Sequence, residues 1–350
     1  MWAVSLRVNA LVFGCGIIVV CWALLGNGCT PIDPIKKITG PAQGSSYNIS
    51  YWSEQPVDQA RLQQQITAEL ERIDLAMSNY RPDSTIEKFN QQQSIEPMEV
   101  GTELVQLVAQ ARFVSSQSQG CYDLTVKPLF DLWGFKADQF HQPTSEQLEL
   151  TMQSIGMAKI RDAGASMLAK QLPELRIDVS SIAQGWTVAQ LAKIVEQAGI
   201  ENYLVEVGGE LLVRGKKPEQ QAWRVAIEKP LPGAQTLQKV ITIKQDEPMA
   251  VMTSGTYRHY FDAEGVRYSH VLDARSGAPV KHQTVSATVL IEDPTLGDAW
   301  STAFLCLGSQ DGKAVADRLG MKVLFIDQLG DELVEINSDA LQNSQAVSLQ

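Results

Sequence analysis

Two of the four histidines in the chain lie in one short stretch, 255–279, which also contains Ser269 and Asp273. An imidazole changes its charge close to neutral pH, so His259 and His270 are candidates for acid–base chemistry, with Asp273 as a neighbour that could orient His270. The alternative is a structural role, in which backbone and carboxylate groups nearby satisfy both rings. The residue types alone leave both interpretations open.

Asp298 and Thr302 are four residues apart in a segment, 296–307, whose pattern predicts a helix. Residues at this spacing share one helix face, so their oxygen atoms can reach the same hard cation. Mg²⁺ suits such a sparse ligand set because it retains water and takes further ligands from substrate phosphates. The alternative is a solvated aspartate favoured by the helix dipole, beside a threonine that only packs.

The segment 178–181, Asp-Val-Ser-Ser, lies where another helix is predicted to begin. These residue types commonly cap a helix by accepting hydrogen bonds from its first N–H groups. The same helix terminus could instead meet a metal-bound phosphate, with Ser181 presenting an oxygen to the metal. Tyr80, Tyr122 and Trp133 could stack on a planar ring, although aromatic residues near Gly and Pro also fill ordinary cores.

The elements that must position these residues alternate between helices and strands without a βαβ repeat. This order predicts an α+β fold, a single large body of mainly antiparallel strands with packed helices. Helices are predicted over 57–77, 103–115, 144–156, 176–199, 296–307 and 312–319. Strands are predicted over 43–51, 203–207, 211–214, 223–227, 240–244, 249–253, 285–291, 322–327 and 332–336.

Two further segments have distinctive patterns. Aromatic and apolar runs bounded by glycine predict a hairpin with strands over 257–262 and 266–273 and a turn over 263–265. The stretch 120–135 is dense in aromatic residues and punctuated by Gly and Pro, which predicts a compact loop.

The chain has 350 residues, of which 44% are hydrophobic, and a net charge of −11. This composition is typical of a globular protein with ample material for a core. The acidic balance argues against a general nucleic-acid-binding surface. A polyanionic ligand would therefore need a local device, such as a metal ion or a helix N-terminus.

The N-terminus has the layout of a bacterial export signal, with Arg7 before an uncharged stretch, 8–32, that ends near Cys29. Lipidation of Cys29 and an uncleaved membrane anchor are the two alternatives, and both would tether the protein to a membrane. We expect a signal peptide or anchor over 1–28 and a linker over 29–41. The catalytic body is then expected over 42–337, followed by a polar tail over 338–350.

Only Cys121 and Cys306 remain in the predicted body of the chain. They form no CxxC or Cys/His cluster, so neither a zinc site nor a disulfide framework is indicated. A single bridge between them is possible in an oxidising compartment.

Taken together, these segments resemble the ApbE family of FAD:protein FMN transferases. The resemblance extends from about Gly44 to Gly308, and the blocks occur in the family's order. They are Met77–Ser84, Asp123–Val126, Asp178–Gly185, Val207–Glu210, Thr253–Gly255 with Arg267–Asp273, and Asp298–Ala303.

The resemblance implies a Mg²⁺-dependent transfer of FMN from FAD to a threonine hydroxyl of a partner protein, with release of AMP. By position, it implies FAD contacts at Gln43, Tyr80, Cys121, Tyr122, Asp123, Asp178, Gln184, His270 and Val271. It implies metal ligands at Ser181, Asp298 and Thr302, and a catalytic base at His270. Gln184 and Ser181 differ from the residues that many relatives have at these positions.

The resemblance also implies a setting for the reaction. The family's usual acceptors are membrane-bound subunits of Na⁺-pumping NADH:quinone reductase and Rnf-type complexes. We therefore expect a protein on the periplasmic face of a bacterial inner membrane, tethered through Cys29 or its anchor and without a nucleic-acid partner. Two alternatives remain open, a periplasmic FAD pyrophosphatase and an FAD-binding lipoprotein without catalysis.

Overall fold

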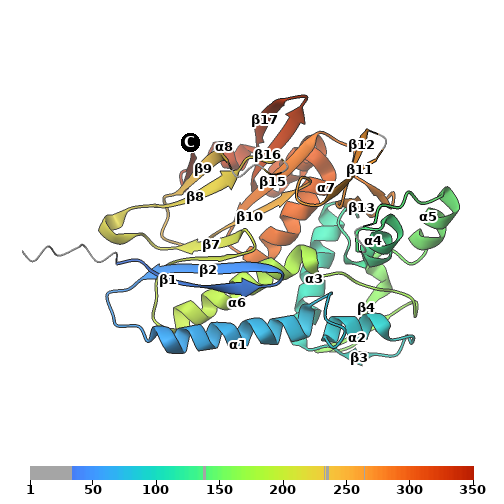
Figure 1. Ribbon diagram of the computed structural model, residues 1–350, viewed down its shortest axis with the longest axis horizontal. Coiled ribbons are helices and arrows are strands. Elements are labelled where there is room, and N and C mark those ends of the chain that lie inside the picture. Colours follow the sequence, from blue (N-terminus) through green and yellow to red (C-terminus); the bar gives the residue numbers. More distant parts are fainter. Residues whose placement is uncertain (1–33, 137–138, 232, 234–235, 264) are drawn as a thin grey trace, which may run out of the picture. The chain divides into compact units, whose positions relative to one another are not determined.

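The computed structural model describes residues 34–136, 139–231, 233, 236–263 and 265–350 (Figure 1). The predicted signal or anchor and Cys29 lie outside the described residues, as does Glu264 in the predicted turn. Among the helices of the described part, none combines the length and the apolar character needed to cross a membrane.

An eight-stranded sheet forms the centre of the fold, and all its neighbouring strands are antiparallel. In spatial order the strands are β1 (Lys36–Ala42), β2 (Ser45–Trp52), β6 (Asn202–Val207), β7 (Glu210–Arg214), β10 (Met249–Gly255), β15 (Thr284–Ile291), β16 (Lys322–Leu329) and β17 (Glu332–Asn337). The predicted α+β class is therefore confirmed.

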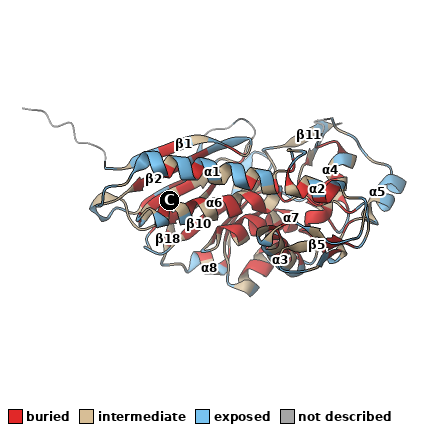
Figure 2. Cartoon of the chain, turned by 90° about the horizontal axis from the view of Figure 1, so that it is seen from below, coloured by how far each residue is buried: buried red, intermediate tan, exposed pale blue. Residues whose placement is uncertain are grey.

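Helices α6 (Ser180–Gln197) and α7 (Pro294–Leu319) pack on one face of this sheet. Helices α1 (Gln59–Met77) and α3 (Thr102–Gln117) pack in turn against α6 and α7. Figure 2 shows the consequence for burial, since α6 and α7 are mostly buried whereas α1 is exposed along its outer face. The amphipathic spacing in α1 arises because only one of its faces meets the protein.

A second, three-stranded sheet covers the opposite face of the large sheet. It consists of β8 (Trp223–Glu228), β9 (Leu237–Ile243) and β18 (Val347–Leu349). Apolar side chains from both sheets, together with Leu341 of α8 (Asp339–Gln342), form one core between them.

Both predicted ends of the catalytic body differ from the structure. The predicted linker, 29–41, contains most of β1, which pairs with β2 along its whole length. The predicted polar tail, 338–350, contains α8 and β18, and β18 pairs with β9. Both errors have the same cause. Edge strands and short terminal helices bury few apolar side chains, so their sequences resemble those of linkers and polar tails.

Smaller elements surround one end of the α6 and α7 pair. They are α2 (Thr85–Gln91), η1 (Leu124–Val126), α4 (Lys127–Trp133), α5 (Ser145–Met152), η2 (Met157–Lys159), and a small sheet of β3 (Met98–Glu99), β5 (Met167–Lys170) and β4 (Ile160–Asp162). The short η3 (Pro218–Gln220) lies elsewhere, in the connection between β7 and β8. The prediction of a loop over 120–135 is wrong, because its Pro and Gly delimit α4 instead of breaking it. Pro128 lies in the first turn of α4, and Gly134 ends it with φ of 83°.

The predicted hairpin is present but shorter. It pairs β11 (Tyr260–Ala263) with β12 (Val266–Ser269), and a second small pair joins β13 (Leu272–Asp273) to β14 (Ala278–Pro279). His270 lies between β12 and β13, outside both pairs of strands.

Helices α6 and α7 approach closely at Gly185. A Cβ atom at this position would lie 2.2 Å from the carbonyl oxygen of Pro294 and 2.6 Å from Cβ of Asp298. The absence of a side chain lets the backbone N–H of Gly185 donate to Oδ2 of Asp298 at 2.8 Å. Gly185 therefore sets the distance between the two helices and the position of Asp298.

We expect Gly185→Ala to lower the free energy of unfolding by about 1–3 kcal/mol, because the added methyl group must push α7 away. Urea unfolding followed by circular dichroism measures the change. Gln190→Ala, in the same helix, is the control and should stay within about 0.5 kcal/mol of the parent. Equal stabilities for the two variants would contradict the close approach at Gly185.

Candidate active site

A cavity of about 330 Å³ lies where α6, α7, the end of β10 and the segments around Tyr122 and His270 meet. Of the predicted site residues in the described part of the chain, all but Gln43 line it. They are Tyr80, Cys121, Tyr122, Asp123, Asp178, Ser181, Gln184, His270, Val271, Asp298 and Thr302. Segments from almost the whole sequence thus converge on one site.

Gln43 lines a neighbouring cavity of about 600 Å³. Tyr80, Ser180 and Gln184 line both cavities, so the two adjoin at these residues. The side chain of Gln43 lies in the turn between β1 and β2 and donates from Nε2 to Oγ1 of Thr187 at 2.7 Å. Gln43 is therefore close to the predicted site without lining its central cavity.

Two buried carboxyl groups face the central cavity. The exposed fractions of Asp298 and Glu210 are 4% and 5%. Oδ2 of Asp298 accepts from the N–H of Gly185 at 2.8 Å, and Oε2 of Glu210 accepts from the N–H of Thr253 at 3.1 Å. Burial raises the pKa of Asp298 to about 7. Burial and the nearby charge of Asp298 raise the pKa of Glu210 as well.

Hydroxyl groups lie beside these carboxyl groups. Oγ of Ser254 lies 3.0 Å from Oγ1 of Thr302 and 2.7 Å from Oγ of Ser301. Across the cavity, Ser181 donates to the hydroxyl oxygen of Tyr122 at 3.1 Å. Buried carboxyl groups beside hydroxyl oxygens are a donor set that fits Mg²⁺, because a cation would offset the cost of burying two acids together.

One ring nitrogen of His270 forms a hydrogen bond with the backbone, and the other is available to accept a proton. Nδ1 lies 2.8 Å from the carbonyl oxygen of His259, which can only accept, so Nδ1 carries the proton. Nε2 is then the proton acceptor of the ring. Burial lowers the pKa of His270 to about 4, so the imidazole is neutral at neutral pH. This is the protonation state that a general base requires.

The orienting partner of His270 differs from the prediction. The carboxylate of Asp273 pairs with the guanidinium of Arg275 at 2.7 Å, and the backbone of His259 orients His270 instead. The ring of His259 also lines the cavity and stacks on that of His270 with centroids 5.8 Å apart. The strand pairing of the hairpin brings the two histidines together.

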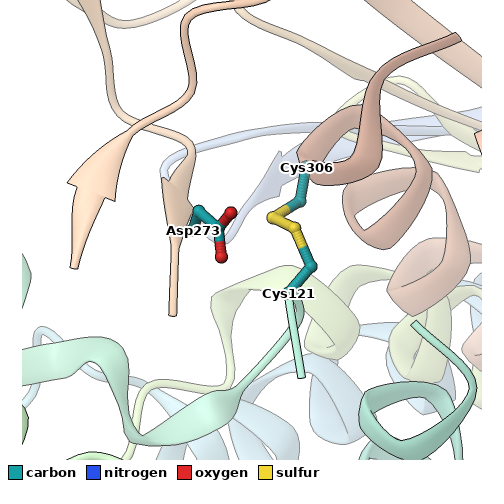
Figure 3. A group of neighbouring side chains, drawn as sticks. All are labelled: Cys121, Asp273 and Cys306. Carbon is teal, nitrogen blue, oxygen red and sulfur yellow. A yellow bond between two sulfur atoms is a disulfide. The ribbon is translucent and has the colours of Figure 1, made fainter. Parts of the chain in front are cut away.

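A disulfide joins Cys121 to Cys306, with Cα atoms 6.0 Å apart (Figure 3). Both cysteines are buried and line the cavity. The bond links the segment that contains Tyr122 directly to α7, which contains Asp298 and Thr302. The nearby carboxylate of Asp273 does not make this group a thiolate metal site, because each sulfur is bonded to the other.

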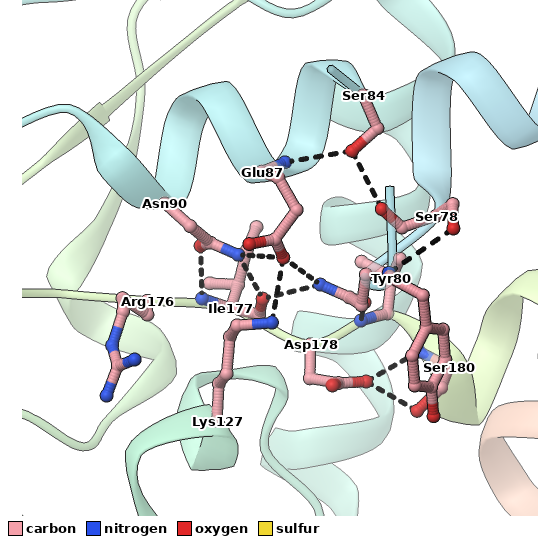
Figure 4. Close-up of polar contacts among 12 residues, drawn as sticks. Ser78, Tyr80, Ser84, Glu87, Asn90, Lys127, Arg176, Ile177, Asp178 and Ser180 are labelled. Atoms are coloured by element: carbon pink, nitrogen blue, oxygen red, sulfur yellow. Dashed lines mark hydrogen bonds and ion pairs between the residues drawn. The ribbon is translucent and has the colours of Figure 1, made fainter. Parts of the chain in front are cut away.

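A buried polar network lies beneath the Tyr80 segment (Figure 4). Oε1 of Glu87 accepts from Nζ of Lys127 at 2.7 Å and from the side-chain amides of Asn79 and Asn90 at 3.0 and 3.1 Å. The side chains of Glu87 and Lys127 are nearly inaccessible to water. Removing one member would leave a buried charge without its partner, so the network fixes α2 and α4 relative to each other.

The same network reaches the segment before α6. Asn79 and Asn90 both donate to the carbonyl oxygen of Ile177, and Oδ1 of Asn79 accepts from the N–H of Val179 at 2.8 Å. Asp178, between these two residues, accepts from the N–H of Ser180 at 2.9 Å. Tyr80 itself is 86% exposed. The buried network therefore holds the backbone next to Tyr80, whose own side chain is exposed.

Asp123 lines the cavity, but its carboxylate is engaged within the protein. Oδ1 accepts from the N–H of Thr125 at 2.7 Å, and Oδ2 accepts from the N–H of Met157 at 2.9 Å. Burial raises the pKa of Asp123. These bonds shape the cavity wall around Tyr122.

Comparison with known proteins adds to this geometry. The sequence matches the ApbE family over residues 43–325, which is most of the chain. The chain belongs to the ApbE family. A curated relative from Vibrio cholerae, named FAD:protein FMN transferase, is 37% identical over 322 residues, covering 91% of this chain and 95% of that protein. The relative of that name from Escherichia coli K12 is 34% identical over 86% of this chain and 87% of its own.

Solved structures agree with the ApbE assignment. The flavin transferase ApbE from Vibrio cholerae is 35% identical with a TM-score of 0.80, covering 89% of this chain and 99% of its own. The apo form of the flavinyl transferase ApbE from Pseudomonas stutzeri is 33% identical with a TM-score of 0.80, covering 89% of this chain and 96% of its own.

Sequence analysis assigned no role to Glu210, Ser254 or Arg258, which line the cavity of this ApbE-family protein. Glu210 and Ser254 lie in segments that resemble the family, whereas Arg258 does not, and Glu210 directly follows Gly208 and Gly209. The φ angles of these glycines are 62° and 102°, so the turn delivers Glu210 into the core at the start of β7. A charged residue at the buried end of a strand was the pattern that could have revealed it.

The buried carboxyl of Asp298 predicts a pH-dependent stability of the metal-free protein. Burial raises its pKa to about 7 in the folded protein, whereas an unfolded chain gives about 3.9. Between these values the unfolded chain has lost a proton that the folded protein keeps, so the free energy of unfolding falls as the pH rises. Asp298→Asn keeps an oxygen for Gly185 but does not titrate, so it avoids this loss.

We therefore expect the stability of Asp298→Asn relative to the parent to increase between about pH 5 and about pH 8, by on the order of 1 kcal/mol or more. Urea unfolding in EDTA at both pH values measures it. Asp311→Asn, an exposed position in α7, should show no such trend. A constant difference between Asp298→Asn and the parent would contradict the raised pKa.

Proposed function

We propose that this protein transfers FMN from FAD to a hydroxyl group of another protein, forming a phosphoester and releasing AMP. The main support is the convergence of a neutral imidazole, His270, and the buried carboxyl groups of Asp298 and Glu210 on one cavity. Membership of the ApbE family, with relatives named FAD:protein FMN transferase, supports the same reaction.

The reaction has two chemical demands. A hydroxyl group is a weak nucleophile, so a base must accept its proton as its oxygen bonds to the FMN phosphorus. The bond from that phosphorus to the bridging oxygen then breaks, and AMP leaves with the electron pair. Nε2 of His270 is the acceptor for the proton, because Nδ1 already donates to His259.

The second demand is positive charge around the pyrophosphate. Asp298, Thr302 and Ser181 would hold Mg²⁺, and Glu210 lies in the same cavity. When bound, Mg²⁺ neutralises phosphate oxygens and polarises the reacting phosphorus. The hydrogen bond from Gly185 keeps Asp298 turned toward this position.

FAD is an elongated molecule, and two adjoining cavities suit it better than one. The pyrophosphate would lie in the central cavity, close to Asp298 and His270. Tyr80 and Gln184 border both cavities, so ring systems of FAD can extend past them. The exposed ring of Tyr80 offers a face on which a planar ring can stack.

The acceptor and the location complete the proposal. A threonine hydroxyl of a membrane-bound subunit, in a Na⁺-pumping NADH:quinone reductase or an Rnf-type complex, would receive the FMN. The protein would act on the periplasmic face of the inner membrane, tethered by lipidated Cys29 or by an uncleaved anchor. The export-type pattern of the N-terminal sequence supports this location.

A form of the protein that lacks the predicted signal or anchor, residues 1–28, is mixed with FAD, Mg²⁺ and an acceptor domain that contains a threonine. We expect a fluorescent flavin adduct of the acceptor on a denaturing gel. His270→Ala should slow transfer about 10²–10⁴-fold while FAD affinity changes little, because a base is lost without removing the pocket. FAD affinity is measured by quenching of flavin fluorescence. His141→Ala, an exposed histidine outside both cavities, is the matched control.

Two results would contradict the proposal. Release of AMP and free FMN without an adduct on any of the acceptors would indicate a pyrophosphatase. Tight retention of FAD without Mg²⁺-dependent turnover would indicate a binding protein. Loss of FAD binding in His270→Ala would instead assign His270 to substrate binding.

A further inference from the structure

Arg258 lines the central cavity, and its side chain is exposed at the mouth. Within the described residues its guanidinium forms no hydrogen bond or ion pair, and it lies 5.9 Å from the centroid of the Tyr257 ring. Two arginines that follow in the chain differ. Arg267 pairs with Asp262 at 3.0 Å, and Arg275 pairs with Asp273 at 2.7 Å. The arginine at the cavity is thus the one of the three without an anion.

The glycine turn between β6 and β7 makes room for this guanidinium. Nη2 of Arg258 lies 3.2 Å from the point where a Cβ atom of Gly209 would lie. Any larger residue at this position would press on Arg258, and φ of 102° already disfavours one. The turn therefore places Arg258 next to Glu210, the first residue of β7. The positive charge of Arg258 acts on both Glu210 and His270, so the guanidinium lies within electrostatic reach of the acid and the base of the site.

Charge balance indicates what Arg258 binds. When Asp298 binds the metal it is ionised, and its carboxylate together with the two phosphates of FAD brings more negative charge than one divalent cation cancels. The site therefore needs another positive group near the pyrophosphate, and Arg258 is a cation that lines the same cavity. A guanidinium is planar and can donate two parallel hydrogen bonds to phosphate oxygens.

We propose that Arg258 binds the pyrophosphate of FAD and neutralises negative charge that develops on its oxygens as AMP leaves. This inference rests on the function proposed above. The acceptor oxygen bonds to the FMN phosphorus, its proton passes to His270, and the bond to the bridging oxygen breaks. Arg258 exchanges no proton in this step and contributes positive charge and orientation.

The experiment compares Arg258→Ala and Arg258→Lys with Arg267→Ala, a matched control whose ion pair lies outside the cavity. Arg258→Ala should lower kcat/KM for FAD in the transfer reaction about 10²–10³-fold. Arg258→Lys should recover part of this loss, because lysine keeps the positive charge but cannot donate two parallel hydrogen bonds as a guanidinium does. KM for the acceptor should be unchanged, and Arg267→Ala should resemble the parent.

A binding measurement without turnover separates this inference from the proposed function. FAD and riboflavin, which lacks phosphates, are titrated into each protein in EDTA. Arg258→Ala should weaken the affinity for FAD several-fold and leave the affinity for riboflavin unchanged.

Equal effects on the affinities for both ligands would overturn the inference. Unchanged FAD binding together with an unchanged kcat/KM for FAD would overturn it as well. A raised KM for the acceptor alone would also overturn it, by assigning Arg258 to an acidic group of the acceptor. Absence of any adduct with the parent protein would refute the transferase and leave the binding comparison intact.

Discussion

The hydrogen bond from the N–H of Gly185 to Oδ2 of Asp298 is the contact on which the site depends. It forms because Gly185 has no side chain, so α6 and α7 approach until the backbone of one reaches the carboxylate of the other. The bond fixes a buried acid at the crossing of the two helices that cover the central sheet. Thr302, one turn further along α7, follows from the same placement.

Two other walls of the site are tied to this helix pair by contacts that span long stretches of sequence. The disulfide between Cys121 and Cys306 attaches the Tyr122 segment to α7. The buried network around Glu87 attaches the Tyr80 segment to the residues that precede α6. A site with such supports is preorganised, because its groups do not have to be ordered when the substrate binds.

The electrostatics of the site follow from burial. Asp298 and Glu210 are costly to ionise where water is excluded, and the same exclusion keeps His270 neutral. The site is therefore complementary to a dianionic pyrophosphate. Its buried acids favour a bound cation, its imidazole carries no positive charge and can accept a proton, and its arginine has no carboxylate partner in the described part of the chain. The net charge of −11 does not oppose such a ligand, because the positive groups act locally.

The sequence by itself determined most helices, most central strands and the facing of Asp298 and Thr302, because apolar periodicity and helical spacing are local properties. It also supplied the family resemblance that singled out His270. Only the tertiary structure decided that β1 and β18 belong to the fold, that Cys121 bonds Cys306, and that the His259 carbonyl orients His270. It also revealed Glu210 and Arg258 in the site. These features depend on contacts between residues far apart in the chain, and no local pattern encodes which distant groups meet.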